Sequence, residues 1–430
     1  MIERAVALAF ARGLEPIVRT PGLVDAIEIE PETFALDPRD WAAVCALPQP
    51  KVIHAVGHAP GGSLPVPAAD ARWLADRVRE TGAEWASHHL AVNWFGAGRF
   101  ASFFLPPRQT AAGVAAAARS IRALARQLPV PFAVETGVSY LRPREDELPD
   151  GAFAGAVAEA ADCGLLLDLH NVWTNARNGR QPVAAYLAQL PLDRVIEVHV
   201  AGGMELDGFW LDAHAGAPPP EVLALLDDTL PRLPRCRAIT FEVLDGFIPR
   251  MGLDAIGATL ERLRRAWDRP RAPVSIAVSQ SVPEDTHGPD DVVAWESALG
   301  ALVLGASPLA TTASIELAAA LADDPGVALY AKLVEQARAS ALVIASPFAT
   351  RVLVLALGVT EATALFARFW GVVDPSPTFT GEADRFADWL AATGLAVPNL
   401  ADALVIDAAS RRATEAGATI EYELVPVLAQ

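Results

Sequence analysis

Residues 164–171 read GLLLDLHN, a short apolar run followed directly by an acid and an imidazole. An apolar run of this length between polar segments predicts a buried β-strand. Asp168 and His170 come where that strand would end, and a packed core needs neither of them, because burying unpaired polar groups is costly. The stretch therefore predicts a strand that carries functional groups at its carboxyl end.

Similar apolar runs recur through the first 268 residues, with amphipathic, helix-like stretches between them. The expected strands cover residues 6–10, 23–29, 52–56, 84–89, 132–135, 165–168, 195–199 and 239–242. The clearest helices cover residues 68–81, 110–128, 219–233 and 253–267. Eight strands that alternate with helices predict an α/β fold, a (β/α)8 TIM barrel. A doubly wound sheet is the alternative, but it concentrates its site at one switch point, whereas here polar residues end most strands.

The composition of the chain changes near residue 269. Asp268 is followed by Arg-Pro-Arg-Ala-Pro, which is typical of a domain boundary. After polar residues 279–291 the chain becomes a series of Ala-rich helical segments, whose tryptophans and phenylalanines supply a separate core. We therefore predict a barrel domain at residues 1–268, a linker at 269–285 and a smaller, mostly α-helical domain at 286–430.

Composition and charge narrow the class of protein. The chain of 430 residues is 52% hydrophobic and 20% charged, which is typical of a well-packed soluble protein. A formal net charge of −18 argues against nucleic acid, whose binders usually carry a basic face. Three widely spaced cysteines without a CxxC motif and an N-terminus unlike a signal peptide suit the cytoplasm. Residues 341–359 are the most apolar later segment, but they contain Pro347 and Arg351, so we expect a buried helix pair and no membrane span.

Imidazoles and carboxylates stand at the ends of most of the expected strands. The carboxyl ends of barrel strands form the active face, so we expect these candidate metal ligands to gather there: His54, His89, Glu135, Asp168, His170, His199, Asp212, His214 and Glu242. Nine nitrogen and oxygen donors would serve two or three ions, and a set without thiolates suits Fe, Mn or Zn. Glu135, midway in the series, could bridge two ions. Each residue alone could be a hydrogen-bonded structural group, but so many successive strand ends of this kind favour a polynuclear metal site.

The strings around these residues resemble one known family. They are LVDAIEIEPETF (23–34), IHAVGHAPGGS (53–63), WASHHLAV (85–92), AVETGVSYL (133–141), LLLDLHNVWTNARN (165–178), RVIEVHVAGG (194–203), LDAHAGAPPPEV (211–222) and ITFEVLDGFIP (239–249). In this order they resemble the DUF692 family of multinuclear non-heme iron-dependent oxidative enzymes (MNIO), which includes the methanobactin biosynthesis oxidase. The resemblance covers roughly residues 1–265, and the strings that begin at Leu165 and Arg194 are the most specific.

The resemblance implies a function. It implies a (β/α)8 barrel that holds two or three irons, with a mixed-valent Fe(II)/Fe(III) pair, on the nine candidate ligands named above. The enzyme would use O2 to modify a residue of a ribosomally synthesised precursor peptide, most often Cys and sometimes Asp or Asn. Glu135, Asp168 and His199 would be the metal-centred catalytic residues. We further expect His58, His88 and Asn171 to support the ligands and Asn93 to lie in the pocket.

The sequence departs from the family pattern at three positions. Thr136 replaces the usual Asn after the third ligand strand, His88 replaces the acid that often precedes the second histidine, and His170 replaces a frequent Asn. An imidazole binds iron more strongly than an amide does, so metal binding should survive. These positions leave open how the metals are tuned and whether a third ion binds.

The C-terminal region also fits the resemblance. Many enzymes of this family work with a small partner protein that recruits the precursor peptide, and residues 330–416, with FARFWGVVDPSPTFTGEADRFADWLAATG at 366–394, resemble such a partner fused in cis. Fusion would keep the recruiting surface at high effective concentration beside the site. An unrelated helical dimerisation domain is the alternative.

Two other functions stay open at this point. A xylose-isomerase-like divalent-metal barrel, either a sugar isomerase or epimerase or an endonuclease IV-like enzyme, also uses His, Glu and Asp at strand ends. The acidic balance argues against DNA, and Lys51, the one lysine of the barrel region, would lie at the wrong end for sugar isomerisation. The other alternative is a non-catalytic peptide-binding scaffold that keeps its metals for structure.

Overall fold

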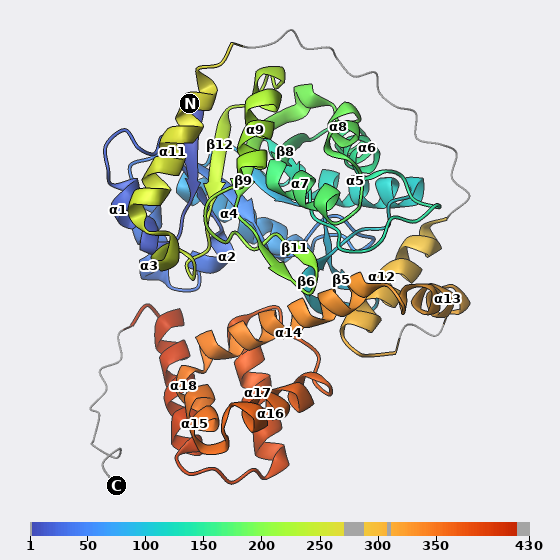
Figure 1. Ribbon diagram of the computed structural model, residues 1–430. Coiled ribbons are helices and arrows are strands. Elements are labelled where there is room, and N and C mark those ends of the chain that lie inside the picture. Colours follow the sequence, from blue (N-terminus) through green and yellow to red (C-terminus); the bar gives the residue numbers. More distant parts are fainter. Residues whose placement is uncertain (1, 271–287, 308–310, 419–430) are drawn as a thin grey trace. The chain divides into compact units, whose positions relative to one another are not determined.

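The computed structural model describes residues 2–270, 288–307 and 311–418 (Figure 1). Contacts divide the chain into two compact units. The first comprises Met1–Pro31 and Pro48–Lys332, and the second comprises Glu32–Leu47 and Leu333–Gln430. The predicted linker at 269–285 lies outside the described residues, apart from its first two.

Eight parallel strands of the first unit close into a barrel, which confirms the predicted fold. They are β1 (Ala5–Ala9), β2 (Ala26–Ile29), β3 (Lys51–Ala55), β4 (Ala86–His89), β7 (Phe132–Glu135), β8 (Gly164–Asp168), β9 (Val195–Ala201) and β12 (Ala238–Glu242). The barrel strands are neighbours in chain order, and β12 pairs with β1 to close the ring. Every residue of β2, β3, β9 and β12 is buried, as expected for parallel strands that helices cover.

The strand register separates a polar rim from an apolar interior. At the carboxyl rim, His89 of β4 lies opposite Glu135 of β7, and Asp168 of β8 lies opposite His199 of β9. Toward the amino ends of the strands, a cluster of buried apolar side chains fills the barrel: Ile2, Ala5, Ala7, Ala26, Val52, Trp85, Ala133, Leu166, Ile196 and Ala238. The candidate ligands therefore gather at the carboxyl end of the barrel, where the loops that follow the strands can surround a site.

Helices connect the barrel strands. Those of the first unit are α1 (Glu15–Val18), α4 (Ala68–Thr81), α5 (Ala111–Ala125), α6 (Asp150–Ala161), α7 (Leu169–Arg177), α8 (Val183–Ala188), α9 (Pro220–Thr229), α10 (Ile248–Met251) and α11 (Leu253–Trp267), with 3-10 turns at Arg12–Leu14, Leu192–Arg194 and Leu230–Arg232. The predicted bounds of α4 and α11 are those observed. Helix α4 ends where Gly82 adopts a left-handed φ of +64°, which a residue without Cβ accepts most easily.

Two antiparallel hairpins follow barrel strands and were not predicted. One is formed by β5 (Val92–Phe95) and β6 (Arg99–Leu105), the other by β10 (Met204–Leu206) and β11 (Phe209–Leu211). Both follow strands that carry candidate ligands, β4 and β9. Their backbone carries the chain from the rim into the loops that surround it.

Helices beyond the predicted linker also belong to the first unit. They are α12 (Pro289–Val303), α13 (Thr312–Leu321) and the beginning of α14 (Pro325–Ala345). Helix α12 packs against α5, β5 and β6. Its Trp295 indole donates to the Pro106 carbonyl at 3.1 Å, and the Arg108 guanidinium lies 5.1 Å from the Trp295 ring while bonding Asp291. The unit that holds the barrel thus extends to Lys332, well past residue 286.

The second unit is helical. It contains α2 (Pro31–Phe34) and α3 (Pro38–Cys45) together with the rest of α14, α15 (Pro347–Leu357), α16 (Val359–Trp370), α17 (Phe379–Thr393) and α18 (Leu400–Glu415). Its core is built from Leu342, Ala349, Leu353, Leu365, Phe369, Phe386, Leu390, Leu400 and Ala403. Buried Arg338 forms an ion pair with Glu382 at 2.7 Å, and Asp407 accepts the backbone N–H groups that begin α15.

In the part of the chain that the structure describes, no single helix is both long and apolar enough to span a bilayer. The pair Pro325–Ala345 and Pro347–Leu357, bent by 108°, meets the length and composition criteria when its two helices are taken together.

Candidate metal centre

The structure places all nine predicted ligands at the carboxyl rim of the barrel or in the segments that follow it. His54, His89, Glu135, Asp168 and Glu242 end barrel strands, His199 lies inside β9, His170 begins α7, and Asp212 and His214 follow β11. Strand geometry explains this gathering, since the carboxyl ends of parallel strands meet at one rim. Eight of the nine side chains fall into three neighbouring groups, and His170 contacts Asp212 of the third group.

The first group consists of His54, His89 and Glu135, whose ligand atoms lie within 4.8 Å of one another. His54 Nε2 is 3.3 Å from a Glu135 carboxylate oxygen, which His89 Nδ1 also approaches. The Ser87 hydroxyl lies 3.2 Å from the Ile53 carbonyl, to which it donates, and 2.8 Å from His54 Nδ1. Since that hydroxyl has one hydrogen, it accepts from His54 Nδ1–H, which leaves the His54 Nε2 lone pair facing the group.

The second group consists of Glu135, Asp168 and His199, also within 4.8 Å. Asp168 caps α7: one of its oxygens accepts the Asn171 N–H at 2.8 Å, and the other has no hydrogen-bond partner. His199 Nε2 is 3.0 Å from a carboxylate oxygen of Glu28, whereas His199 Nδ1 faces the centre and lies 3.2 Å from a Glu242 oxygen. Glu135 belongs to both groups, as expected of a bridging ligand.

Asp212, His214 and Glu242 form the third group. His214 Nε2 lies 3.2 Å from an Asp212 oxygen and 3.5 Å from a Glu242 oxygen. The Asp212 backbone N–H donates to the Tyr140 hydroxyl at 3.1 Å. His214 has a left-handed φ of +46°, which is uncommon for a residue with a side chain and is often found at functional sites.

The surroundings of the buried ligand atoms show that this donor set fits metal ions. Among the described residues, Asp168 Oδ2 has no hydrogen-bond partner. The close contacts of Glu135 Oε2, His199 Nδ1 and Glu242 Oε2 are with other candidate ligands. Burying acceptors without partners is costly, and cations would satisfy them. Because the set contains only nitrogen and oxygen donors, it suits Fe, Mn or Zn.

The buried negative charge of the cluster also favours the binding of cations. Burial raises the pKa of Asp168 well above its usual range, and the charge of Asp212 raises it further. Burial alone would lower the pKa of His54, but the carboxylates of Glu135 and Glu28 raise it to about 9. Protons thus compensate part of the buried negative charge, and bound metal ions would displace them.

Glu28 is a member of the site that the sequence analysis missed. It is 2% exposed, burial raises its pKa to about 7, and it lies with His199 and Glu242 in a further group of ligand atoms within 4.8 Å. Its side chain bonds the His199 nitrogen that faces away from the second group, so it fixes the ring orientation. The available signal was a charged residue between Ile27 and Ile29 in an otherwise apolar strand.

The expected supporting residues have different surroundings. The Asn171 amide donates to Glu135 at 3.2 Å, so it contacts a candidate ligand directly. Asn93 bonds the Gly57 carbonyl and the Ala59 N–H, and thereby holds the loop after β3.

The two histidines in this set make mainly ring contacts. The ring of His58 stacks on Trp94 at 5.3 Å. His88 is buried and its ring contacts those of His89 and Phe104.

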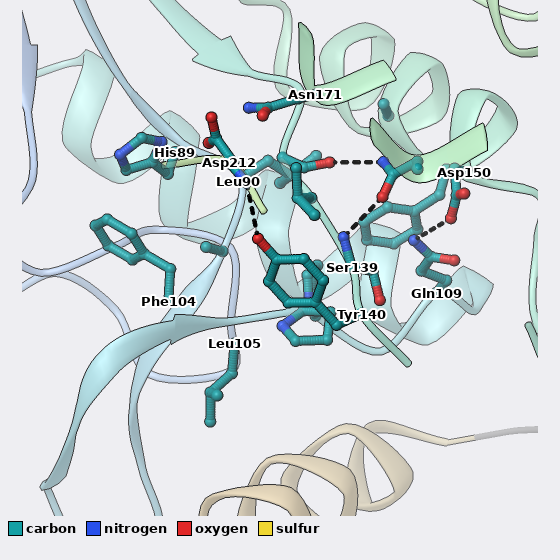
Figure 2. A pocket seen from close by; sticks show the side chains of 18 of the residues that line it. His89, Leu90, Phe104, Leu105, Gln109, Ser139, Tyr140, Asp150, Asn171 and Asp212 are labelled. Carbon is teal, nitrogen blue, oxygen red and sulfur yellow. Dashed lines mark hydrogen bonds between the residues drawn. The ribbon is translucent and has the colours of Figure 1, made fainter. Parts of the chain in front are cut away.

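A pocket of about 110 Å³ adjoins the centre (Figure 2). Its metal-facing end carries the candidate ligands His89 and Asp212 beside Asn171. Its apolar wall includes Leu90, Phe103, Phe104, Leu105, Val138, Phe153 and Tyr330. A volume of this size admits one small side chain.

Helix α14 closes part of this pocket. The Tyr330 hydroxyl accepts the Tyr140 backbone N–H at 3.2 Å, and the hydroxyl of Tyr140 points toward Asp212 (Figure 2). A Cβ on Gly326 would lie 2.2 Å from the Tyr140 carbonyl, so only glycine permits this approach. The segment beyond the barrel therefore contributes to the wall of the site.

Known proteins resemble the barrel part of the chain. The family model of the RiPP precursor modification enzymes MbnB/TglH/ChrH matches residues 11–263, where RiPP denotes a ribosomally synthesised and post-translationally modified peptide. A UPF0276 protein of Anaeromyxobacter sp. (strain Fw109-5) is 32% identical over 203 residues, 47% of this chain and 71% of that protein. A UPF0276 protein of Caulobacter vibrioides (strain NA1000 / CB15N) is 28% identical over 249 residues, 57% of this chain and 87% of that protein.

Solved structures with low sequence identity also align. A xylose isomerase domain protein from Planctomyces limnophilus has a TM-score of 0.43 at 15% identity and covers 61% of this chain and 95% of its own. A D-psicose 3-epimerase from Clostridium cellulolyticum H10 has a TM-score of 0.40 at 11% identity, with the same two coverages. From its family model and its relatives, this chain belongs to the RiPP precursor modification enzyme family MbnB/TglH/ChrH.

Proposed function

We propose that the protein is a multinuclear non-heme iron oxidase that uses O2 to modify one residue of a precursor peptide. The observation that carries the proposal is the rim where three groups of imidazoles and carboxylates lie side by side and open on one pocket. Membership of a family of precursor modification enzymes supports the peptide substrate. The nitrogen and oxygen donors support iron.

Each group would hold one ion. The first would bind to His54, His89 and Glu135, the second to Glu135, Asp168 and His199, and the third to Asp212, His214 and Glu242. When bound, irons in mixed Fe(II)/Fe(III) valence would supply the redox chemistry that lets O2 oxidise the substrate residue. Glu135 would hold the first two ions at a fixed separation, and Asp168 and His199 would complete the central position.

The pocket would position the substrate side chain. One end of it reaches the candidate ligands His89 and Asp212, and its apolar wall would exclude water from the reacting residue. A cysteine is the most suitable substrate residue, because metal binding favours deprotonation of a thiol and the thiolate is the ligand form. Aspartate and asparagine are the alternatives.

The second unit would recruit the peptide in cis. Its α15 and α16 carry apolar side chains that are largely exposed, with Leu355 79% and Val359 70% accessible. Exposed apolar residues of this kind favour an interaction surface. Covalent linkage would keep the peptide at high local concentration for the barrel.

A sugar isomerase that relies on a lysine is less consistent with the geometry. Lys51 begins β3, at the amino end of the barrel, and its ammonium group donates to the Gln49 carbonyl at 3.0 Å. His54, the candidate ligand on this strand, lies toward the opposite end of it.

Metal analysis and a peptide assay test the proposal. The full chain is purified without oxygen, its metals are measured, and it is mixed with a candidate precursor peptide sought among the short reading frames beside its gene. We expect two or three irons per chain and an O2-dependent mass change of the peptide at one Cys, Asp or Asn. Full occupancy by zinc or manganese, with no iron-dependent activity, would contradict the proposal.

A further inference from the structure

The hydrogen bonds of His170 leave no lone pair for a metal ion. The Trp210 indole N–H lies 3.1 Å from His170 Nε2, and an indole nitrogen can only donate. His170 Nε2 is therefore the acceptor, and a neutral His170 carries its hydrogen on Nδ1. That nitrogen lies 3.2 Å from a carboxylate oxygen of Asp212, to which it donates.

The indole that imposes this arrangement is firmly held. The Trp210 backbone exchanges two hydrogen bonds with the Asn178 side chain, both at 2.9 Å. The Arg177 guanidinium lies 4.9 Å from the centre of the Trp210 ring, and Trp173 packs edge-on at 5.4 Å. The β10–β11 hairpin is thereby fastened to α7, the helix that carries His170.

The backbone beside the indole is adapted to this contact. A Cβ on Gly203 would lie 2.3 Å from the Trp210 indole nitrogen and 2.8 Å from His170 Nε2. Any larger residue would push the indole away from the imidazole. The absence of a side chain at Gly203 is therefore a second observation that supports the hydrogen bond from the Trp210 indole to His170.

We propose that His170 is a positioning residue that orients Asp212, and that it does not itself bind a metal ion. Two contacts then fix Asp212: His170 holds its carboxylate, and the Tyr140 hydroxyl accepts its backbone N–H. The oriented carboxylate faces His214, which also faces Glu242. This inference rests on the proposed metal centre and assigns the third ion to Asp212, His214 and Glu242.

Two substitutions test the role of His170 in the full chain. Trp210→Phe keeps an aromatic ring but removes the donor, and His170→Asn removes the imidazole. Each protein is reconstituted with Fe(II), its iron content is measured against free iron, and histidine nitrogens on iron are counted by pulsed EPR. The matched control is Trp73→Phe, which changes a partly exposed indole on α4.

A positioning role predicts a specific pattern. Trp210→Phe and His170→Asn should both weaken binding of one iron by about 10–100-fold, as substitutions behind a ligand commonly do. At saturating iron, both should show the same number of histidine couplings as the unchanged chain. The Trp73→Phe variant should bind iron normally.

Other results separate failure of this inference from failure of the proposed function. If His170→Asn loses one histidine coupling while Trp210→Phe binds iron normally, then His170 is a ligand and the inference is wrong. If the unchanged chain binds no iron, the proposed function itself fails. Gly203→Ala provides a second route, because it displaces the indole without altering either ring and should reproduce the Trp210→Phe result.

Discussion

Two layers of the same barrel bury carboxylates in opposite ways. In the deeper layer, Glu197 is fully buried and accepts from the Trp85 indole at 2.6 Å and from the Thr240 hydroxyl. At the rim, Glu135 and Glu242 are almost as buried, yet each directs one oxygen toward two imidazoles of the cluster. The difference teaches that burial of an acid does not by itself mark a site. Buried carboxylates that converge with several imidazoles distinguish the candidate metal-binding layer from the structural one.

The largest expected effect comes from making the same substitution in both layers. Glu135→Gln should remove at least one iron per chain and reduce peptide modification by about a hundredfold or more, since even residues behind ligands change metal affinity by about 10–100-fold. Glu197→Gln should keep its iron, because an amide can still accept from Trp85. Iron content and product mass measure both variants. If Glu197→Gln loses as much iron as Glu135→Gln, the proposed difference between the two layers is wrong.

A fourth buried carboxylate, outside both layers, sharpens the comparison through pH. Glu296 accepts from the backbone N–H and hydroxyl of Ser63, and burial raises its pKa to about 7 from the ordinary 4.5. Between these two pH values the unfolded chain has lost the proton that the folded chain keeps. The free energy of unfolding should therefore fall as pH rises through this window, by up to about 3 kcal/mol.

Glu296→Gln should make that fall smaller by the contribution of this one group, and the remaining slope comes from groups such as Glu28, whose pKa is also raised to about 7. Denaturant unfolding at pH 5 and pH 8 measures the change. The control is Asp290→Asn, which alters an exposed acid of the same helix and should leave the slope as it is. An unchanged slope in Glu296→Gln would refute the assignment.

A smaller effect is expected where α14 meets the pocket. Gly326→Ala would place a Cβ 2.2 Å from the Tyr140 carbonyl and push the helix away from the pocket wall. We expect KM for the peptide to rise about fivefold and stability to fall by about 1–3 kcal/mol, the usual range for overpacking. Steady-state kinetics and thermal unfolding check both effects.

The matched control for that variant is Gly257→Ala in α11. There the added Cβ would lie 3.8 Å from Leu23, an ordinary contact. Normal kinetics are expected, with slightly higher stability, because alanine favours a helix over glycine. If both variants behave alike, the close approach of α14 to the Tyr140 carbonyl does not affect function.

The smallest expected effect concerns peptide recruitment by the second unit. Leu355→Asp places a charge on a side chain that is 79% exposed, so folding should be unaffected. We expect KM for the peptide to rise about threefold with kcat unchanged. Val372→Asp, at a position 72% exposed, controls for added charge. An equal change in both variants, or a change in kcat, would argue against a recruiting surface on α15.

The barrel was predictable because its signals are local. Most barrel strands are apolar runs long enough to recognise, and a polar residue at the end of a strand marks the rim, as at Asp168 and Glu242. Helices α4 and α11 have apolar residues at regular helical spacing and appear where the sequence predicts them. The ligand residues could be placed at one rim because strand order fixes where carboxyl ends meet.

The rest depends on contacts between distant segments. The three-residue strands β10 and β11 are too short to show alternation, yet they deliver Trp210 to His170. Likewise, the pattern of α12 predicts a helix but does not reveal that Trp295 packs beside Pro106, 189 residues away. Glu28 was missed because an acid inside a strand carries no signal for its partner on a distant strand.

The left-handed backbone at His214 has a consequence for the life of the protein when iron is scarce. A strained conformation of this kind persists only where its surroundings hold it, and the ligand contacts of His214 would be completed by a metal ion. Without that ion, the segment around residues 212–216 would lose one of the contacts that hold this conformation. Proteases cut relaxed loops first, so we expect the iron-free chain to be nicked there and cleared, which would couple the abundance of the enzyme to the supply of its metal.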